Sequence, residues 1–259
     1  MQDVITSKDN PKVKRLTMLH ERKKAAKEKL VFIEGVRLCD DALKSGVKPK
    51  LIAVTPDKFD AYKDYSNDGT EIVVLSNECF AKICSTVNPQ GVAMIVDEPS
   101  TGSQIPYRGD GKDIYVVLEA LQDPGNMGTI IRLADAFDFT AVILTDGCVD
   151  PYNEKVLRSS MGSLWHLPLI RVPNSQVAID ELSSKGVSTI AADLRGELLD
   201  SSAVTLPAAY FIGNEGNGLK PETSASCSTK VKIPMPGKAE SLNAASAASI
   251  IGFVLSSLR

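Results

Sequence analysis

Short apolar runs and amphipathic stretches alternate along the first third of the chain. The apolar runs have the length and composition of buried strands, and they lie at 30–33, 51–54, 71–75 and 91–96. Helical patterns separate them, and the one at 36–46 (VRLCDDALKSG) closes on a glycine suited to a helix C-terminus. Asn10 and Pro11 form a good helix start, which predicts a basic helix from there to about Lys29. Together these elements predict a small α/β domain over residues 1–96.

The alternation stops at residues 97–112 and then resumes to the end of the chain. This stretch is rich in Pro, Gly and Ser and has no periodicity, so we expect an interdomain linker. Candidate strands follow at 114–118, 141–145, 167–172, 187–192, 208–212 and 230–233. Helical stretches separate most of them, and 241–258 predicts a closing helix. The pattern favours a second α/β domain over residues 113–259, with a mostly parallel sheet covered on both faces.

Glycine-rich loops follow several of these candidate strands. Ligands of open α/β sheets bind outside the carboxyl ends of the strands, so we expect a site among these loops. The loop GNEGNGLK (213–220) has Leu219 where a P-loop needs its lysine, and the sequence there does not give G-x-G-x-x-G either. Glycines let backbone groups close around an uncharged adenosine as well as a phosphate. The loops therefore argue against a pyrophosphate cradle, while a plain turn and a ligand loop both stay open.

Arg132 is a single cation in an otherwise apolar helical stretch (QDPGNMGTIIRLADAF, 122–137). If Asn126 caps a helix that begins at Met127, Gly128 lies one turn below Arg132 and leaves room for the guanidinium to lean back. A cation near the start of a helix is opposed by the helix dipole by a few tenths to about 1 kcal/mol. Something anionic should compensate, either a substrate phosphate held in bidentate fashion or a neighbouring carboxylate. The carboxylates available for such an ion pair are those of Asp135, Asp123 and Glu119.

Composition excludes several classes of protein. The chain has 259 residues, of which 43% are hydrophobic, and a mean hydropathy of −0.03, as in ordinary globular proteins. No run reaches the roughly 18 apolar residues of a membrane span, and the first residues lack a secretory signal, so we expect a cytoplasmic protein without membrane contact. Five scattered cysteines without a CxxC pair suit reduced thiols better than disulfides or zinc. With only two histidines, the chain offers little for metal binding, and we expect no metal.

Charge is distributed unevenly along the chain. Residues 1–30 hold nine Lys and Arg against four Asp and Glu, a net charge of +5, and the rest of the chain carries −8. A basic arm on an acidic body is a common footprint of nucleic-acid binding. A solvated helix face explains it equally well.

Three segments of the second domain resemble the motifs of a known family. NMGTIIRLA (126–134), FIGNEGNGL (211–219) and IPMPG…SLN (233–243) look like the three motifs of the TrmH (SpoU) branch of the SPOUT methyltransferases. Their order and spacing agree, and 152–168 is also similar to the family. Residues 1–96 more weakly resemble the ribosomal-protein-like substrate-binding domain that often precedes this catalytic domain. One departure is Asp138, where a glycine is common after the helix.

The resemblance implies a fold, a cofactor and a reaction. It implies a deep trefoil knot near the C-terminus, a homodimer, bound S-adenosylmethionine (SAM), and methylation of a ribose 2′-hydroxyl in RNA. The residue matching Arg132 serves the catalytic centre in related enzymes. The residues matching Asn126, Glu215, Ser241 and Asn243 line that centre, and those matching Gly213, Ile233 and Leu242 contact the cofactor. Because the ribose hydroxyl is a weak acid, its proton needs an acceptor, for which Arg132, Glu215 and water are candidates.

The N-terminal helix is the expected RNA contact, through Lys12, Lys14, Arg15, Lys23 and Lys24. The two-domain layout favours ribosomal RNA over transfer RNA, by analogy only. Three other functions stay open: an RNA-binding protein that has kept the fold without the reaction, a base-modifying enzyme of the same superfamily, and a nucleotide-binding oxidoreductase. The missing dinucleotide fingerprint argues against the last of these.

Overall fold

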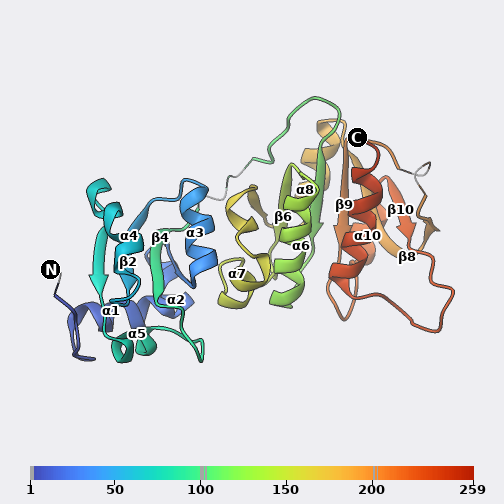
Figure 1. Cartoon of the computed structure of the whole chain (residues 1–259). Coiled ribbons are helices and arrows are strands. Elements are labelled where there is room, and N and C mark those ends of the chain that lie inside the picture. Colours follow the sequence, from blue (N-terminus) through green and yellow to red (C-terminus); the bar gives the residue numbers. More distant parts are fainter. Residues whose placement is uncertain (1–2, 100–101, 103, 201, 203) are drawn as a thin grey trace. The chain divides into compact units, whose positions relative to one another are not determined.

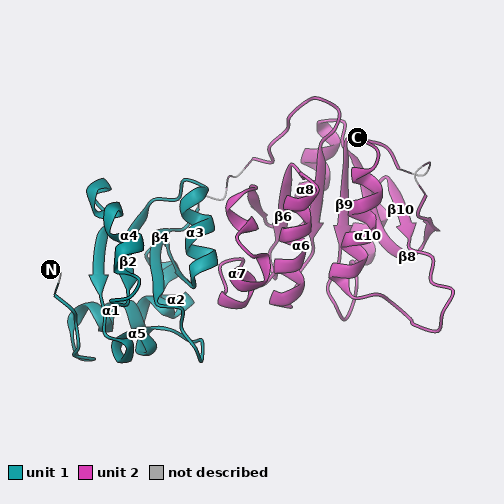
Figure 2. Cartoon of the chain, in the orientation of Figure 1, with its two compact units in different colours: residues 1–100 teal, residues 101–259 magenta. Residues whose placement is uncertain are grey.

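The computed structural model describes residues 3–99, 102, 104–200, 202 and 204–259. The chain forms two compact units, residues 1–100 and 101–259 (Figure 2). The boundary between them along the chain lies inside the stretch expected to be a linker. Part of that stretch belongs to the second unit, because Ile105 is buried in its core and the Tyr115 hydroxyl donates to the carbonyl of Pro106 at 2.7 Å. Residues 100, 101 and 103 of the expected linker lie outside the described residues. No helix in the described part of the chain is long and apolar enough to cross a bilayer.

Unit 1 is a four-stranded sheet with helices around it. Its strands are β1 (Leu30–Glu34), β2 (Pro49–Val54), β3 (Glu71–Val74) and β4 (Val92–Asp97), in the order β1-β4-β2-β3. β4 runs antiparallel to β1 and β2, whereas β2 and β3 are parallel. The helices are α1 (Pro11–His20), α2 (Arg22–Lys27), α3 (Val36–Lys44), α4 (Phe59–Tyr62), η1 (Lys63–Asp68) and α5 (Asn77–Ile83) (Figure 1). All four strands expected from the apolar runs are confirmed, within two residues at each end.

The expected basic helix starts as predicted but is broken in the middle. The Asn10 side chain accepts a hydrogen bond from the Lys12 backbone N–H at 2.9 Å, and Pro11 opens the helix. The prediction of one continuous helix to Lys29 is wrong, because Glu21 takes an extended conformation that separates α1 from α2. The turn lets Arg22 donate to the Leu30 carbonyl at 3.0 Å, which fixes α2 at the start of β1.

Unit 2 is built on a six-stranded sheet in which every strand pair is parallel. The strands are β5 (Ile114–Leu118), β6 (Ala141–Thr145), β7 (Leu169–Val172), β8 (Ser188–Leu198), β9 (Ala208–Ile212) and β10 (Thr229–Lys232), in the order β10-β8-β9-β5-β6-β7. The helices are α6 (Pro124–Ala136), α7 (Glu154–Ser160), η2 (Ser163–Trp165), α8 (Ser175–Ser184), α9 (Pro221–Ser226) and α10 (Ala244–Ser256) (Figure 1). The expected α/β class, the parallel sheet and all six strand positions are confirmed, although β8 runs six residues further than expected.

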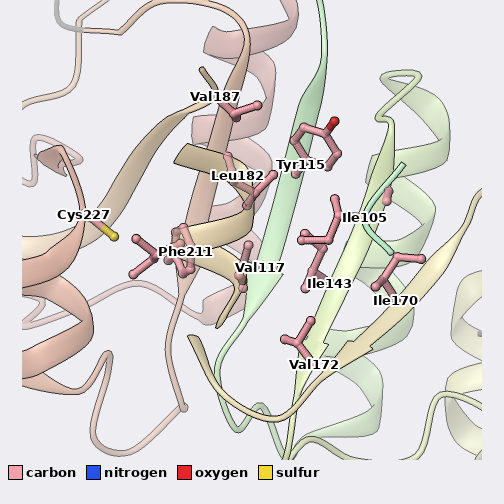
Figure 3. Packing of buried hydrophobic residues seen from close by; sticks show 14 of the residues in the cluster. Ile105, Tyr115, Val117, Ile143, Ile170, Val172, Leu182, Val187, Phe211 and Cys227 are labelled. Carbon is pink, nitrogen blue, oxygen red and sulfur yellow. The ribbon is translucent and has the colours of Figure 1, made fainter. Parts of the chain in front are cut away.

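Alternating side chains of the strands build a core on each face of this sheet. Tyr210 of β9 faces α10, where its hydroxyl donates to the Ala248 carbonyl at 3.1 Å. The next residue, Phe211, points to the other face and packs in a cluster with Val117 and Leu182 of α8 (Figure 3). Because helices cover both faces, the strands read as continuous apolar runs.

Asp138, the departure from the family pattern, ends α6 in the left-handed conformation. Its φ is +52°, the region that glycine adopts most easily. Its carboxylate accepts two hydrogen bonds from Arg108, at 2.9 and 3.0 Å, and lies 3.2 Å from the Arg259 guanidinium. These contacts tie residue 108 and the last residue of the chain to the end of α6. Asp138 therefore ends the helix in a conformation that glycine adopts easily, although it is not a glycine.

Two substitutions separate the backbone strain at Asp138 from its ion pairs. Asp138→Gly removes the carboxylate and relieves the left-handed backbone, whereas Asp138→Ala removes the carboxylate and keeps a Cβ there. We expect both variants to be less stable than the parent and the alanine variant to be the less stable of the two. The gap should be about 1 kcal/mol in the free energy of unfolding from urea titrations. Equal stabilities of the two variants would show that the backbone conformation contributes nothing.

Candidate active site

A hollow of about 600 Å³ opens at the carboxyl ends of β9 and β10 and beside the middle of β8 in unit 2. β8 contributes Ala192–Leu194, β9 ends at Ile212 and Gly213, and β10 contributes Val231 and Lys232. The loops 214–218 and 240–243 and the first turns of α10 close the other sides. The hollow lies where the sequence predicts a site, among the loops beyond the strand ends. The volume is that of a site for a small organic ligand or cofactor.

Gly213 shapes the wall of this hollow. A Cβ at this position would lie 2.0 Å from the Gly218 carbonyl carbon, so only glycine lets the loop fold back on itself. The loop is closed by two backbone hydrogen bonds between Asn214 and Gly218, at 3.1 and 2.8 Å. Gly213, Ile233 and Leu242, the three residues expected to contact the cofactor, all line the hollow.

A hydrogen-bond network joins the three motif segments beside the hollow. The Glu215 carboxylate accepts from the backbone N–H of Asp123 at 2.9 Å and of Gln122 at 3.1 Å, and from the Asn126 amide at 3.0 Å. The Asn126 oxygen in turn accepts from the Asn243 amide at 2.8 Å. The structure thus brings together three of the five expected catalytic-centre residues. The other two, Ser241 and Arg132, are outside this network, and Ser241 lines the hollow without a hydrogen bond to any described residue.

The surroundings of Glu215 keep its carboxylate ionised. Burial by itself raises the pKa of Glu215, but the Asn126 amide and the two backbone N–H groups outweigh it and lower the pKa below its usual value. Three of the roughly four acceptor positions of the carboxylate are already directed at donors. Glu215 is therefore suited to holding the loops in place and poorly suited to accepting a proton.

The start of α6 differs from the expectation. The helix begins at Pro124, and the Asp123 side chain caps it by accepting from the Asn126 backbone N–H at 2.7 Å. The prediction that Asn126 caps the helix is wrong, because this residue already lies in the first turn. Its side chain is consequently free to join the network with Glu215 and Asn243.

Arg132 lies on the solvent-exposed side of α6, outside the wall of the hollow. The room expected beside Gly128 is taken by α7, since a Cβ there would lie 1.9 Å from the Ser159 hydroxyl. The space that the guanidinium would need beside Gly128 is therefore filled. Among the described residues it also makes no ion pair, so the alternative of a neighbouring carboxylate partner is wrong.

The three carboxylates proposed as partners for Arg132 are all engaged elsewhere. Asp135, one turn along α6, binds the His166 Nδ1 at 2.8 Å, and Asp123 caps the helix. Glu119 is buried at the end of β5, where it accepts from Ser175, Thr223 and the Lys220 backbone N–H at 2.6–2.8 Å. The guanidinium of Arg132 is thus available to an anion from outside the chain.

Sequence reasoning missed Asp193 and gave Glu119 a different role, although both carboxylates shape the site. Asp193, in the middle of β8, lines the hollow, and Arg195 together with the Ser224 hydroxyl holds its pKa well below the usual range. Glu119 anchors the end of the glycine-rich loop through Lys220. Asp193 directly follows the candidate strand 187–192, so the strand-end rule that singled out the other loops could have found it.

Most of the expected RNA-contacting cations on α1 and α2 have partners within unit 1. Lys12 pairs with Glu71 at 2.6 Å, Lys14 with Asp9 at 3.0 Å and Lys24 with Glu21 at 2.7 Å, while Arg15 pairs with Glu28. Lys23 alone among the five makes no ion pair with a described residue. Exposed pairs of this kind contribute only about 0–1 kcal/mol each, so a phosphate can replace the carboxylate.

Comparison with known proteins gives the family. The SpoU rRNA Methylase family model matches residues 113–253, and the MRM3-like substrate binding domain model matches residues 10–94. The 23S rRNA (guanosine(2553)-2′-O)-methyltransferase RlmP of Bacillus subtilis is 34% identical over 252 residues, 97% of this chain and 98% of that protein. The chain belongs to the SpoU rRNA methylase family. As a SpoU family member it is an RNA methyltransferase that uses SAM.

Solved structures of the SpoU family share the whole fold. The AdoMet-bound rRNA methyltransferase from Sinorhizobium meliloti has a TM-score of 0.87 at 29% identity, over 98% of this chain and 97% of that one. The SpoU methyltransferase AviRb from Streptomyces viridochromogenes, in complex with AdoMet (SAM), has a TM-score of 0.81 at 27% identity, over 96% and 97%.

The hollow of unit 2 suits the cofactor of the SpoU family. SAM carries a sulfonium and an ammonium group, and the hollow is lined by the carboxylates of Asp193, Glu215 and Glu240. Ile212, Ile233 and Leu242 supply apolar surface for the uncharged parts of the molecule. The close approach of backbone at Gly213 provides the cradle that a Cβ would fill.

Proposed function

We propose that this protein transfers a methyl group from SAM to a ribose 2′-hydroxyl of ribosomal RNA. The observation that carries the proposal is the network of Glu215, Asn126 and Asn243, which links all three family motifs at the edge of the cofactor hollow. The likeness to a 23S rRNA 2′-O-methyltransferase along the full length of both chains supports ribose as the acceptor and ribosomal RNA as the substrate. A cytoplasmic location is part of the proposal.

Each residue of the site has a role in this reaction. SAM supplies an electrophilic methyl group when bound. Gly213, Ile233 and Leu242 hold the cofactor, while Glu215 fixes Asn126 and Asn243 so that their amides orient the incoming strand. Ser241 offers its free hydroxyl as a further hydrogen-bonding group. Arg132 grips the phosphate beside the target ribose and orients the 2′-hydroxyl, a positioning effect that can supply several kcal/mol of the barrier.

The ribose proton passes to water or to Arg132 in this proposal. Glu215 is excluded as acceptor because its carboxylate already receives three N–H donors and its pKa is lowered. Arginine has a very high pKa, which makes its transient deprotonation difficult, so we favour water.

The proposal includes the knot and the homodimer of the family. The folded-back loop at Gly213 and the segment 240–243, which lie on the same hollow, are the parts of the chain that we place in the trefoil knot. For the dimer, we assign the outer face of α10 as the contact, because Phe253 exposes 61% and Ile250 39% of their surface on one helical stripe.

Phe253→Asp tests this dimer. We expect the variant to sediment as a monomer at micromolar concentration, since it places a charge at the centre of the apolar stripe. Val177→Asp is the matched control, because Val177 exposes 40% of its surface on α8, on the other face of the sheet. If both variants sediment like the parent, α10 is not the dimer contact.

Labelled methyl transfer tests the function itself. The purified chain is incubated with methyl-labelled SAM and, separately, with ribosomal RNA, transfer RNA and no RNA, and the product is digested to nucleosides. We expect label in a 2′-O-methylated nucleoside from ribosomal RNA. Label on a base would show the base-modifying reaction instead, and the absence of label from every RNA would show a binding protein without activity.

A further inference from the structure

Unit 1 carries a second hollow, of about 690 Å³, that the methyl-transfer site does not use. It lies at one edge of the small sheet, where Thr55 follows β2, Asn77 begins the helix after β3, and Gly91 precedes β4. β1 and β2 both run antiparallel to β4, so Val36, which follows β1, lies at the same edge. This is the carboxyl edge of the three parallel-running strands, the place where open α/β sheets bind ligands.

The wall of this hollow is held in a fixed shape. The Gln90 side chain accepts from the Val36 backbone N–H at 2.8 Å and so ties the loop before β4 to the start of α3. The Thr55 backbone N–H donates to the Gly91 carbonyl at 3.0 Å. Gly91 has a φ of +78°, and a Cβ there would lie 2.3 Å from the Thr55 hydroxyl. The hollow therefore exists before a ligand arrives.

Unused hydrogen-bonding groups line this hollow. The Asn77 side-chain amide makes no hydrogen bond with any described residue, and the Gln90 amide nitrogen is likewise unpaired within the described chain. Lys58, whose side chain is 39% exposed, has only a distant ion pair, 3.9 Å from Asp57. Pro89 adds apolar surface, and Phe80, which is buried in the core, lies behind the wall. Amide donors and acceptors beside apolar surface fit the edge and the face of a nucleobase.

Two exposed side chains extend this chemistry beyond the hollow. Val87, in the same loop as Gln90, exposes 95% of its surface. Arg37 follows Val36, and its side chain is 66% exposed with a contact of 3.8 Å to Asp41. Val87 thus lies three residues before Gln90, and Arg37 directly follows Val36, whose backbone N–H donates to the Gln90 side chain.

We propose that this hollow binds one unpaired nucleotide of the RNA substrate, an inference that rests on the proposed function. Asn77 and Gln90 hydrogen-bond the edge of the base, and Lys58 and Arg37 contact the flanking phosphates. Unpaired bases are the part of RNA that proteins read by hydrogen bonds to base edges, whereas the bases of a duplex are stacked inside it. The hollow thus selects a loop or bulge of the RNA.

Filling the hollow tests the proposal in the full-length protein. Ala81 is exposed on α5 and lines the hollow, so Ala81→Phe occupies part of it without touching the core. We expect Ala81→Phe to weaken binding of a short fluorescein-labelled single-stranded RNA about tenfold, measured by fluorescence anisotropy. Binding of a blunt RNA stem should be unchanged, as should the midpoint of thermal unfolding and SAM affinity. Ala61→Phe, at an exposed alanine of α4 outside the lining, is the matched control and should bind both RNAs as the parent does.

A second pair of variants avoids any change in packing. Asn77→Ala and Lys58→Ala should each weaken binding of the single strand about threefold, whereas Lys63→Ala, a lysine of similar exposure outside the hollow, should not. Parent-like binding of the single strand by Ala81→Phe, or equal loss of the stem, would overturn the proposal. The parent protein's methyl transfer to ribosomal RNA separates the two hypotheses. Label in the RNA together with parent-like binding by Ala81→Phe refutes the hollow alone, whereas absence of label from every RNA refutes the proposed function.

Discussion

We expect Arg132→Ala to lower the rate of methyl transfer at least tenfold and to leave the affinity for SAM nearly unchanged. The reason is geometric: the guanidinium lies outside the wall of the cofactor hollow and is free of ion pairs with the described residues. In the proposed reaction, its loss removes the group that orients the phosphate and the ribose and removes nothing from the wall of the cofactor hollow. An orienting contact worth about 1.4 kcal/mol in the transition state already gives tenfold in rate.

Steady-state kinetics with ribosomal RNA and calorimetric titration with SAM provide the two measurements for Arg132→Ala. Arg171→Ala is the matched control, because Arg171 is an exposed arginine of the same unit that pairs with Asp150 at 3.6 Å. This control should retain the parent rate. Equal losses of rate and SAM affinity in Arg132→Ala would mean that the arginine supports the fold of the cofactor site and does not hold RNA.

The strands of the parallel sheet could be predicted because their environment is uniform. β5, β6 and β9 begin and end at the residues expected from their apolar runs, since both faces of each strand are buried. The extension of β8 beyond Ala192 could not be predicted in this way. It pairs only with β10, across a register shift at Lys230 and Val231, and it exposes Leu194, so it has no apolar pattern.

The sequence gives weaker guidance on which side chains touch. Asp123 and Asn126 are both good helix caps, and a following proline is the signal that favours Asp123. Motif spacing also does not predict that Ser159 fills the space beside Gly128. It does not predict that His166 binds the Asp135 carboxylate either. These contacts are made by residues 31 positions apart in each case, and they depend on how α7 and η2 pack on α6. The exposure of Arg132 follows from that packing.

We expect Asn126→Asp to have the second large effect on methyl transfer, because it removes the donor of one hydrogen bond of the network. The Asn126 amide donates to Glu215 at 3.0 Å, so an aspartate places a carboxylate oxygen against another carboxylate. Breaking a partly buried hydrogen bond and leaving charges unpaired costs about 1–3 kcal/mol. We expect methyl transfer to fall roughly tenfold to a hundredfold at pH 7.5.

The pH dependence of Asn126→Asp distinguishes this repulsion from general damage to the site. Two adjacent carboxylates raise the pKa of one of them, so the pair takes up a proton as the pH falls and the hydrogen bond reforms. Activity of the variant relative to the parent should therefore rise between pH 7.5 and pH 5.5. Asn126→Ala, which cannot form this bond at any pH, is the control and should keep a constant ratio to the parent. Adding Glu215→Gln to Asn126→Asp should restore only part of the activity at pH 7.5. The glutamine amide donates to the new aspartate, the reverse of the parent bond, but its nitrogen cannot also accept from the Asp123 N–H as the Glu215 oxygen does. A double variant no better than the weaker single one would contradict the network.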